Sequence, residues 1–207
     1  MPFFKLHRYF IFALSALALS ACGGSNSNGG PAEADLVDMS LGPVDAPVVM
    51  IEYASSVCGA CAAYHAAMSE TIKTLAEEGK IRFIFREYAT SDVDTAGFSI
   101  ARCAGPDKYF DVVDDLFTNQ RGLFQAARNG TVRAGLQTIA ARHGLDQAAF
   151  ETCLANEDVQ ENIRNAGLYA NANDVTETPT LVLNGVKLIP PEGRTPESLI
   201  ALVEEAR

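Results

Sequence analysis

The stretch VMIEYASSVCGAC, residues 49–61, decides the fold of this chain. Its apolar run breaks into small residues and ends in Cys58-Gly59-Ala60-Cys61. The residues that follow keep a helical period, which places one apolar stripe on Cys61, Tyr64, Met68, Ile72 and Leu75. We therefore predict a buried strand over residues 48–54, followed by a helix that Cys58 caps and in which Cys61 faces the core.

A thiol at the start of a helix has a distinct chemistry, because unpaired N–H groups and the helix dipole favour its thiolate there. Cys58 is expected to have a lowered pKa and to act as a nucleophile, while Cys61 resolves mixed disulfides. Zinc ribbons share the spacing, but they need a second ligand pair, and the sequence has neither that pair nor a Cys-His cluster. The pattern favours a redox pair that needs no metal and no organic cofactor.

Residues 1–22 are typical of a secretory signal, with a basic start, an apolar core and a small-residue end at Leu19-Ser20-Ala21-Cys22. The apolar run is too short to span a bilayer comfortably. The last four residues resemble the bacterial lipobox, in which the cysteine is lipidated. The alternative is a plain signal peptide cut near Ala21, which leaves Cys22 as a spare thiol.

Residues 23–37 are expected to form a flexible tether, because they begin with a Gly, Ser and Asn run that has nothing to bury. Residues 23–207 hold 14 of the 16 basic residues and all 26 acidic ones, a formal net charge of −12. Nucleic acid is therefore excluded as a partner. Gly23 and Gly24 follow the candidate lipidated cysteine, so the sorting rule of enterobacteria favours the inner leaflet of the outer membrane over the inner membrane.

The rest of the chain predicts an α/β domain. Residues 81–88 form a second strand, and the strand–helix–strand order indicates a βαβ unit with its site at the carboxyl end of the first strand. Asn184-Gly185 predicts a hairpin turn between strands at 180–185 and 186–189, and Thr195-Pro196 starts a last helix. Between them we expect helices around 98–103 and over 109–117, 132–141, 147–154 and 159–172, with breaks that include Gly122.

These residues resemble the DsbA-like thiol-disulfide oxidoreductases of the thioredoxin superfamily. The resemblance is carried by Ala46-Pro47-Val48, Glu52-Tyr53-Ala54-Ser55, Arg86-Glu87-Tyr88 and Thr178-Pro179-Thr180, with Leu181 to Gly185 after them, in the order of the family. It implies a thioredoxin-like core over residues 38–90 and 174–207, interrupted by a helical insert over residues 91–173.

The resemblance also implies roles for three further residues. The proline that matches Pro179 is cis in the superfamily, so the backbone of Thr178 would be presented to a substrate chain; an ordinary trans proline at a strand start is the alternative. Glu52 stands where the family has a buried acid that takes the proton of the resolving cysteine, and a solvated strand end is the alternative.

Export places the chain in the periplasm, where disulfides persist. With Cys22 lipidated, Cys103 and Cys153 remain as a second pair, which we expect to form a structural disulfide. Two buried free thiols are the alternative, because a sequence does not show distance.

The expected activity is disulfide exchange with reduced or unfolded exported proteins, with the chain acting as a dithiol oxidase. The resemblance implies a membrane quinone-linked thiol oxidase as the recharging partner. Gly59-Ala60 replaces the Pro-His of many strong oxidants in this family, and Glu177 replaces a common glycine. The alternative within this class is a reductase or an isomerase. Isomerases of the superfamily oligomerise through an N-terminal module, and residues 23–40 are too short and too polar to form one. We therefore expect a monomer. A tethered binding lipoprotein with a purely structural Cys58–Cys61 disulfide is the rival from another class.

Overall fold

Alternation of strands and helices around one sheet defines the architecture of the structure, a computed structural model that describes residues 31–207. The elements in chain order are η1 (Glu33–Asp35), β1 (Met39–Leu41), β2 (Val48–Ala54), α1 (Gly59–Glu77), β3 (Ile81–Glu87), α2 (Asp92–Cys103), α3 (Pro106–Thr118), α4 (Gln120–Arg128), α5 (Val132–Arg142), α6 (Gln147–Leu154), α7 (Glu157–Ala172), β4 (Thr180–Leu183), β5 (Val186–Lys187) and α8 (Pro196–Ala206). The predicted strand at 48–54 and the Thr195-capped last helix are confirmed.

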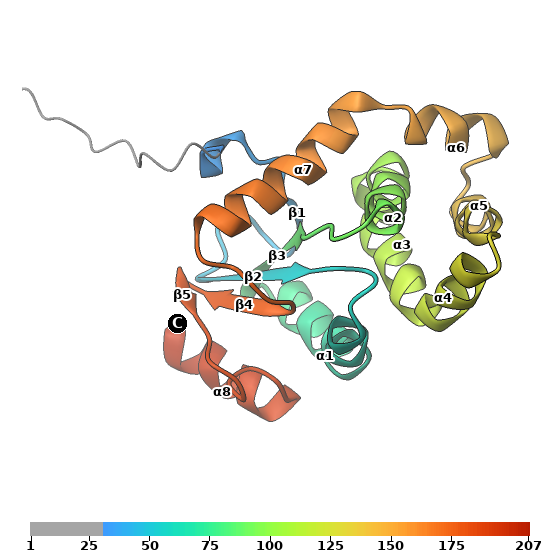
Figure 1. Cartoon of the computed structure of the whole chain (residues 1–207). Coiled ribbons are helices and arrows are strands. Elements are labelled where there is room, and N and C mark those ends of the chain that lie inside the picture. The colour runs from blue at the N-terminus through green and yellow to red at the C-terminus, as the bar shows by residue number, and fades with distance from the viewer. Residues whose placement is uncertain (1–30) are drawn as a thin grey trace, which may run out of the picture.

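The five strands form one sheet in the order β1-β3-β2-β4-β5. Strands β2 and β3 are parallel, as predicted from the βαβ unit, and every other pair is antiparallel. Helices α1 and α8 lie on one side of the sheet and α7 crosses the other, while α2 to α6 gather beside it (Figure 1). The central strand β2 is therefore covered on both faces, which explains why its residues form a nearly continuous apolar run.

Helix α4, strand β1 and the short helix η1 were not expected from the sequence. Helix α4 contradicts the expected break at Gly122: a Cβ there would meet open space, so this glycine costs only about 1 kcal/mol relative to Ala. Burial of Leu123 and Gln120 on the other side of α4 outweighs that cost. Strand β1 is too short for its pattern to show, and it forms because it pairs with β3.

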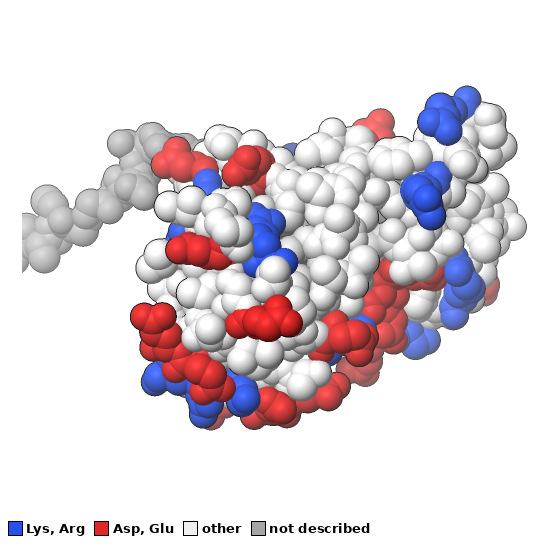
Figure 2. Space-filling model, turned by 90° about the horizontal axis from the view of Figure 1, so that it is seen from below, with Lys and Arg blue, Asp and Glu red and all other residues white. Residues whose placement is uncertain are grey.

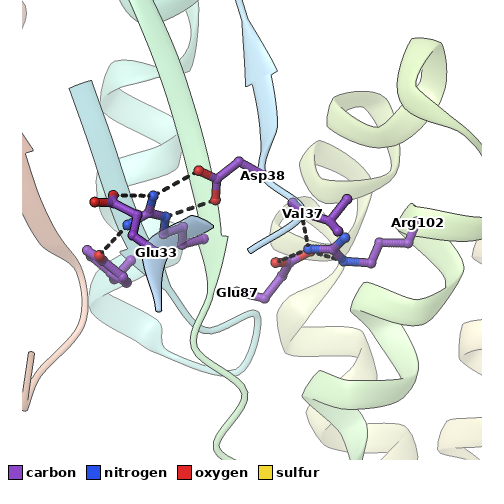
Figure 3. A network of polar contacts seen from close by, with 7 residues as sticks. Glu33, Val37, Asp38, Glu87 and Arg102 are labelled. Atoms are coloured by element: carbon purple, nitrogen blue, oxygen red, sulfur yellow. Dashed lines mark hydrogen bonds and ion pairs between the residues drawn. The ribbon is translucent and has the colours of Figure 1, made fainter. Parts of the chain in front are cut away.

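The first described residues are attached to the domain by buried charges, as Figure 3 shows. The guanidinium of Arg86, 2% exposed, donates to Glu33, Asp38 and the hydroxyl of Tyr53. Beside it, Arg102 donates to both oxygens of the buried Glu87 and to the carbonyl of Val37. Part of the segment expected as a tether thus lies against the sheet.

The surface is predominantly acidic, in line with the net charge of residues 23–207. In the view from the α1 and α8 side, most carboxylates lie over the lower half of the molecule, and a broad area above them has few charged side chains (Figure 2). Within residues 31–207, no helix combines the length and the apolar character that a membrane crossing requires. Cys22 and the expected signal lie outside the described residues.

A disulfide joins Cys103 at the end of α2 to Cys153 in α6, with their Cα atoms 6.0 Å apart. The structure therefore has the expected bond, and it lies within the helices that follow β3. It fastens α6 to α2, which packs against the rest of the molecule through α3 and α7.

Replacing Cys103 and Cys153 together with Ala should lower the free energy of unfolding by about 4 kcal/mol, the loop-closure entropy of a loop of about fifty residues. Urea unfolding of the two proteins measures the difference. Mass spectrometry of unreduced peptides tests the bond itself, and free thiols at both positions would contradict it.

Candidate active site

The two cysteines lie where β2 delivers the chain to α1. Cys58 is the N-cap of α1, and its Sγ accepts a hydrogen bond from the backbone N–H of Cys61 at 3.2 Å. Cys61 is fully buried, whereas Cys58 is partly exposed, and both thiols are free. The predicted cap and the predicted inward face of Cys61 are confirmed, and a substrate can reach only the sulfur of Cys58.

The chain that precedes β4 lies against this thiol. The Sγ of Cys58 donates to the carbonyl oxygen of Thr178 at 3.3 Å, across 120 positions of sequence. The Thr178–Pro179 peptide bond is cis, as the resemblance implied. Glu177 does not disturb this loop, since its carbonyl accepts from the hydroxyl of Thr180 at 2.7 Å. The backbone of Thr178 and the sulfur of Cys58 thus form one continuous site.

The buried thiol needs help to lose its proton. Burial raises the pKa of Cys61, and its hydrogen bond with the sulfur of Cys58 raises it further. An apolar environment disfavours the charged thiolate, so a nearby proton acceptor is required when Cys61 reacts.

Glu52 is a buried acid on β2, the strand that leads to Cys58. Its side chain is 3% exposed, and within residues 31–207 its Oε1 has no hydrogen-bond partner. Burial raises the pKa of Glu52 to about 8, against the opposing effect of the Arg194 guanidinium. The solvated strand end considered as an alternative is therefore wrong, and Glu52 holds its proton through neutral pH.

A small cavity adjoins Glu52. It has a volume of about 20 Å³ and is also lined by Tyr64, His65 and Asp114. That volume is enough for about one water, whose probe sphere needs roughly 10–15 Å³. His65 is partly buried on α1, where it lies 2.9 Å from Asp114 and stacks on Phe117.

Arg194 is a site residue that sequence reasoning missed. Its Nη2 donates to the carbonyl of Pro179 at 2.8 Å, and its guanidinium lies 5.5 Å from the centre of the Tyr64 ring. It therefore links the loop of the cis proline to the helix that carries the cysteines. Its place between a turn and the last helix has no motif that would have singled it out.

Asp94 and Gln120 were missed as well, and both contact the loop that leads to Cys58. Asp94 accepts from Ser56 and Val57, and Gln120 donates to the carbonyl of Cys58. Within residues 31–207, no cluster of three or more His, Cys, Asp or Glu side chains could hold a metal.

This chain belongs to the thioredoxin family, because the family model described as Thioredoxin matches residues 35–205. A protein of Rickettsia bellii, named as an inferred protein-disulfide oxidoreductase, is 27% identical over 176 residues, which cover 82% of this chain and 64% of the relative. A Rickettsia felis protein of the same name is 29% identical over 72% of this chain and 54% of its own length. The chain thus spans between half and two thirds of the length of these relatives.

Solved structures confirm the DsbA-like fold. Wolbachia pipientis alpha-DsbA1 has a TM-score of 0.74 and 25% identity, and the match covers 87% of this chain and 95% of that protein. BdbD from Bacillus subtilis has a TM-score of 0.65 at 17% identity, with 82% and 92% covered, and shows the fold alone. The thioredoxin-like core with its added helices, expected from the sequence, is therefore shown.

Replacing Glu52 with Gln should stabilise the protein at high pH. The folded state holds the proton of Glu52 up to about pH 8, whereas the unfolded state releases it near its ordinary pKa of 4.5. Stability from this group is therefore present below pH 4.5 and is lost as the pH rises toward 8, by an amount on the order of 5 kcal/mol.

Urea unfolding of both proteins at pH 5 and pH 9 measures this difference, with Cys58→Ala and Cys61→Ala in both so that no reactive thiol titrates. The advantage of the Gln variant should grow between the two pH values. Parallel pH dependences would show that Glu52 titrates normally.

Proposed function

We propose that this chain is a thiol-disulfide oxidoreductase that oxidises dithiols of exported proteins. The observation that carries the proposal is a partly exposed thiol at a helix N-terminus, 3.3 Å from the backbone carbonyl that precedes a cis proline, with its partner thiol buried one turn later. A substrate chain that pairs with the Thr178 backbone would bring its own sulfur to Cys58.

The reaction proceeds in two exchanges. A substrate thiolate attacks the Sγ of Cys58, the Cys58–Cys61 bond breaks, and Cys61 leaves with the electron pair. A second substrate thiolate then attacks the substrate sulfur of the mixed disulfide and releases Cys58 as a thiolate. The substrate loses two electrons and two protons, and the enzyme becomes a dithiol.

Glu52 handles the proton of the buried sulfur. When Cys61 leaves, protonated Glu52 gives it a proton, because a bare thiolate in this apolar site is costly. When Cys61 attacks a mixed disulfide during reoxidation, the carboxylate of Glu52 accepts the proton. A pKa of about 8 suits both directions, since it lies close to neutral pH.

The setting of the enzyme is part of the proposal. The chain acts in the periplasm as a monomer, held to a membrane through lipidated Cys22, with the inner leaflet of the outer membrane favoured. A membrane quinone-linked thiol oxidase removes the two electrons and regenerates the disulfide. This part rests on the pattern of residues 1–24 and on the family resemblance.

Thiol labelling across a range of glutathione ratios tests the proposed activity. The Cys58–Cys61 pair should titrate reversibly between dithiol and disulfide, which requires no substrate to be known. A pair that stays oxidised at every ratio would instead support a structural disulfide in a binding protein. A potential below the thioredoxin value of about −270 mV would support a reductase.

Replacing Cys58 with Ser should abolish disulfide transfer to a reduced model protein, because the exposed nucleophile is gone. Replacing Cys61 with Ser should instead trap mixed disulfides with oxidised glutathione through Cys58, since the resolving thiol is absent. Mass spectrometry detects the adduct. Faster labelling of Cys61 than of Cys58 by iodoacetamide in the reduced protein would reverse these roles.

Replacing Gly59-Ala60 with Pro-His should make the protein more oxidising, because an imidazolium beside Cys58 stabilises the reduced form. The wild type should lie between about −270 mV for thioredoxin and about −120 mV for DsbA. A glutathione equilibrium on both proteins measures the change. If the wild type already matches the stronger oxidant and the swap has no effect, the dipeptide does not determine the potential.

A further inference from the structure

The loop between β2 and Cys58 is bound to a single buried carboxylate. Asp94, in the first turn of α2, has no exposed surface. Its Oδ1 accepts from the hydroxyl of Ser56 at 2.7 Å and from the backbone N–H of Val57 at 3.1 Å. Its Oδ2 accepts from the hydroxyl of Ser55 at 2.9 Å and from the N–H and hydroxyl of Thr90, both at 2.9 Å.

Every group that contacts the Asp94 side chain is a hydrogen-bond donor, which suits a carboxylate because its oxygens only accept. Charge-assisted hydrogen bonds of this kind are about twice as strong as neutral ones, and five converge here. The Asp94 carboxylate therefore lies against Val57, one residue before the N-cap of α1, close to the end of the helix where the dipole favours negative charge.

Helix α4 binds the same loop through the backbone carbonyl oxygens of the loop. Gln120, only 7% exposed, donates through Nε2 to the carbonyl oxygens of Ser56 at 2.7 Å and Cys58 at 3.0 Å. Both hydrogens of the amide are thus used on the backbone of the active-site loop. Figure 1 shows the loop that leaves β2 passing close to the group of added helices that includes α4.

We propose that Asp94 and Gln120 are positioning residues through which the added helices set the redox poise of Cys58. Gln120 fixes the backbone of the helix cap, and the Asp94 carboxylate, while holding Ser55 to Val57, opposes the thiolate and makes the disulfide less oxidising. The inference rests on the proposed function.

Replacing Asp94 with Asn removes the charge and keeps most of the contacts. The amide oxygen still accepts from Ser56 and Val57, and the hydroxyls of Ser55 and Thr90 can turn to accept from the amide NH₂, so only the backbone N–H of Thr90 loses its acceptor. The glutathione equilibrium should therefore move several-fold toward the dithiol, because removing a nearby negative charge favours the thiolate of Cys58. Asp92→Asn is the matched control, because Asp92 is exposed in the same turn of α2.

The second variant, Gln120→Glu, should shift the glutathione equilibrium in the opposite direction. A carboxylate would face two carbonyl oxygens, so the anchors are lost and a negative charge is added, and the equilibrium should shift several-fold toward the disulfide. Gln125→Glu, exposed on the same helix, is its control. This second variant also decides the question if Asp94→Asn does not fold.

The outcomes separate the two proposals. A wild-type pair that does not titrate with glutathione overturns the proposed function. A wild-type pair that titrates, with Asp94→Asn and Gln120→Glu each within twofold of its control, overturns this inference alone. Loss of stability without a shift in the equilibrium would likewise reduce both residues to a structural role and overturn it.

Discussion

The hydrogen bond from the Cys61 N–H to the Cys58 sulfur is the contact on which the rest of the structure depends. It places one sulfur at the positive end of α1 and the other inside the core, so two chemically identical side chains differ in access and in proton affinity. The buried strand β2 makes this possible, because pairing with β3 and β4 on its two sides holds the end of the strand in place. The cap would otherwise fray with the loop.

Two buried acidic side chains, Glu52 and Asp94, differ in their surroundings. Glu52 is buried on β2 without a hydrogen-bond partner on Oε1 in the described part of the chain, and the proposed mechanism uses it to exchange a proton. Asp94 has the opposite environment, since hydrogen-bond donors surround both of its carboxyl oxygens. We therefore propose different roles for these two buried acids, because their hydrogen-bond partners differ.

The added helices are more than a cover over the sheet. Asp94 comes from α2 and Gln120 from α4, and both contact the backbone or hydroxyls of the loop that presents Cys58. The Cys103–Cys153 bond fastens α6 to the same α2, so one of the two helices that contact the site is itself cross-linked. Arg194, which precedes the last helix, fixes the other side of the site because its guanidinium donates to the carbonyl of Pro179.

Local sequence alone determined the strand at 48–54, the capped helix with its apolar stripe, and the turn at Asn184-Gly185, where both residues have positive φ. Periodicity and turn chemistry act between near neighbours, so the printed sequence displays them. Tertiary structure decided the contacts of Asp94, Gln120 and Arg194, the pairing of β1, and the tolerance of Gly122 within α4. Asp94 and Gln120 contact loop residues that are 37 to 64 positions away in the sequence. The sequence shows that such a side chain can form hydrogen bonds, but it does not show which distant group folding brings to it.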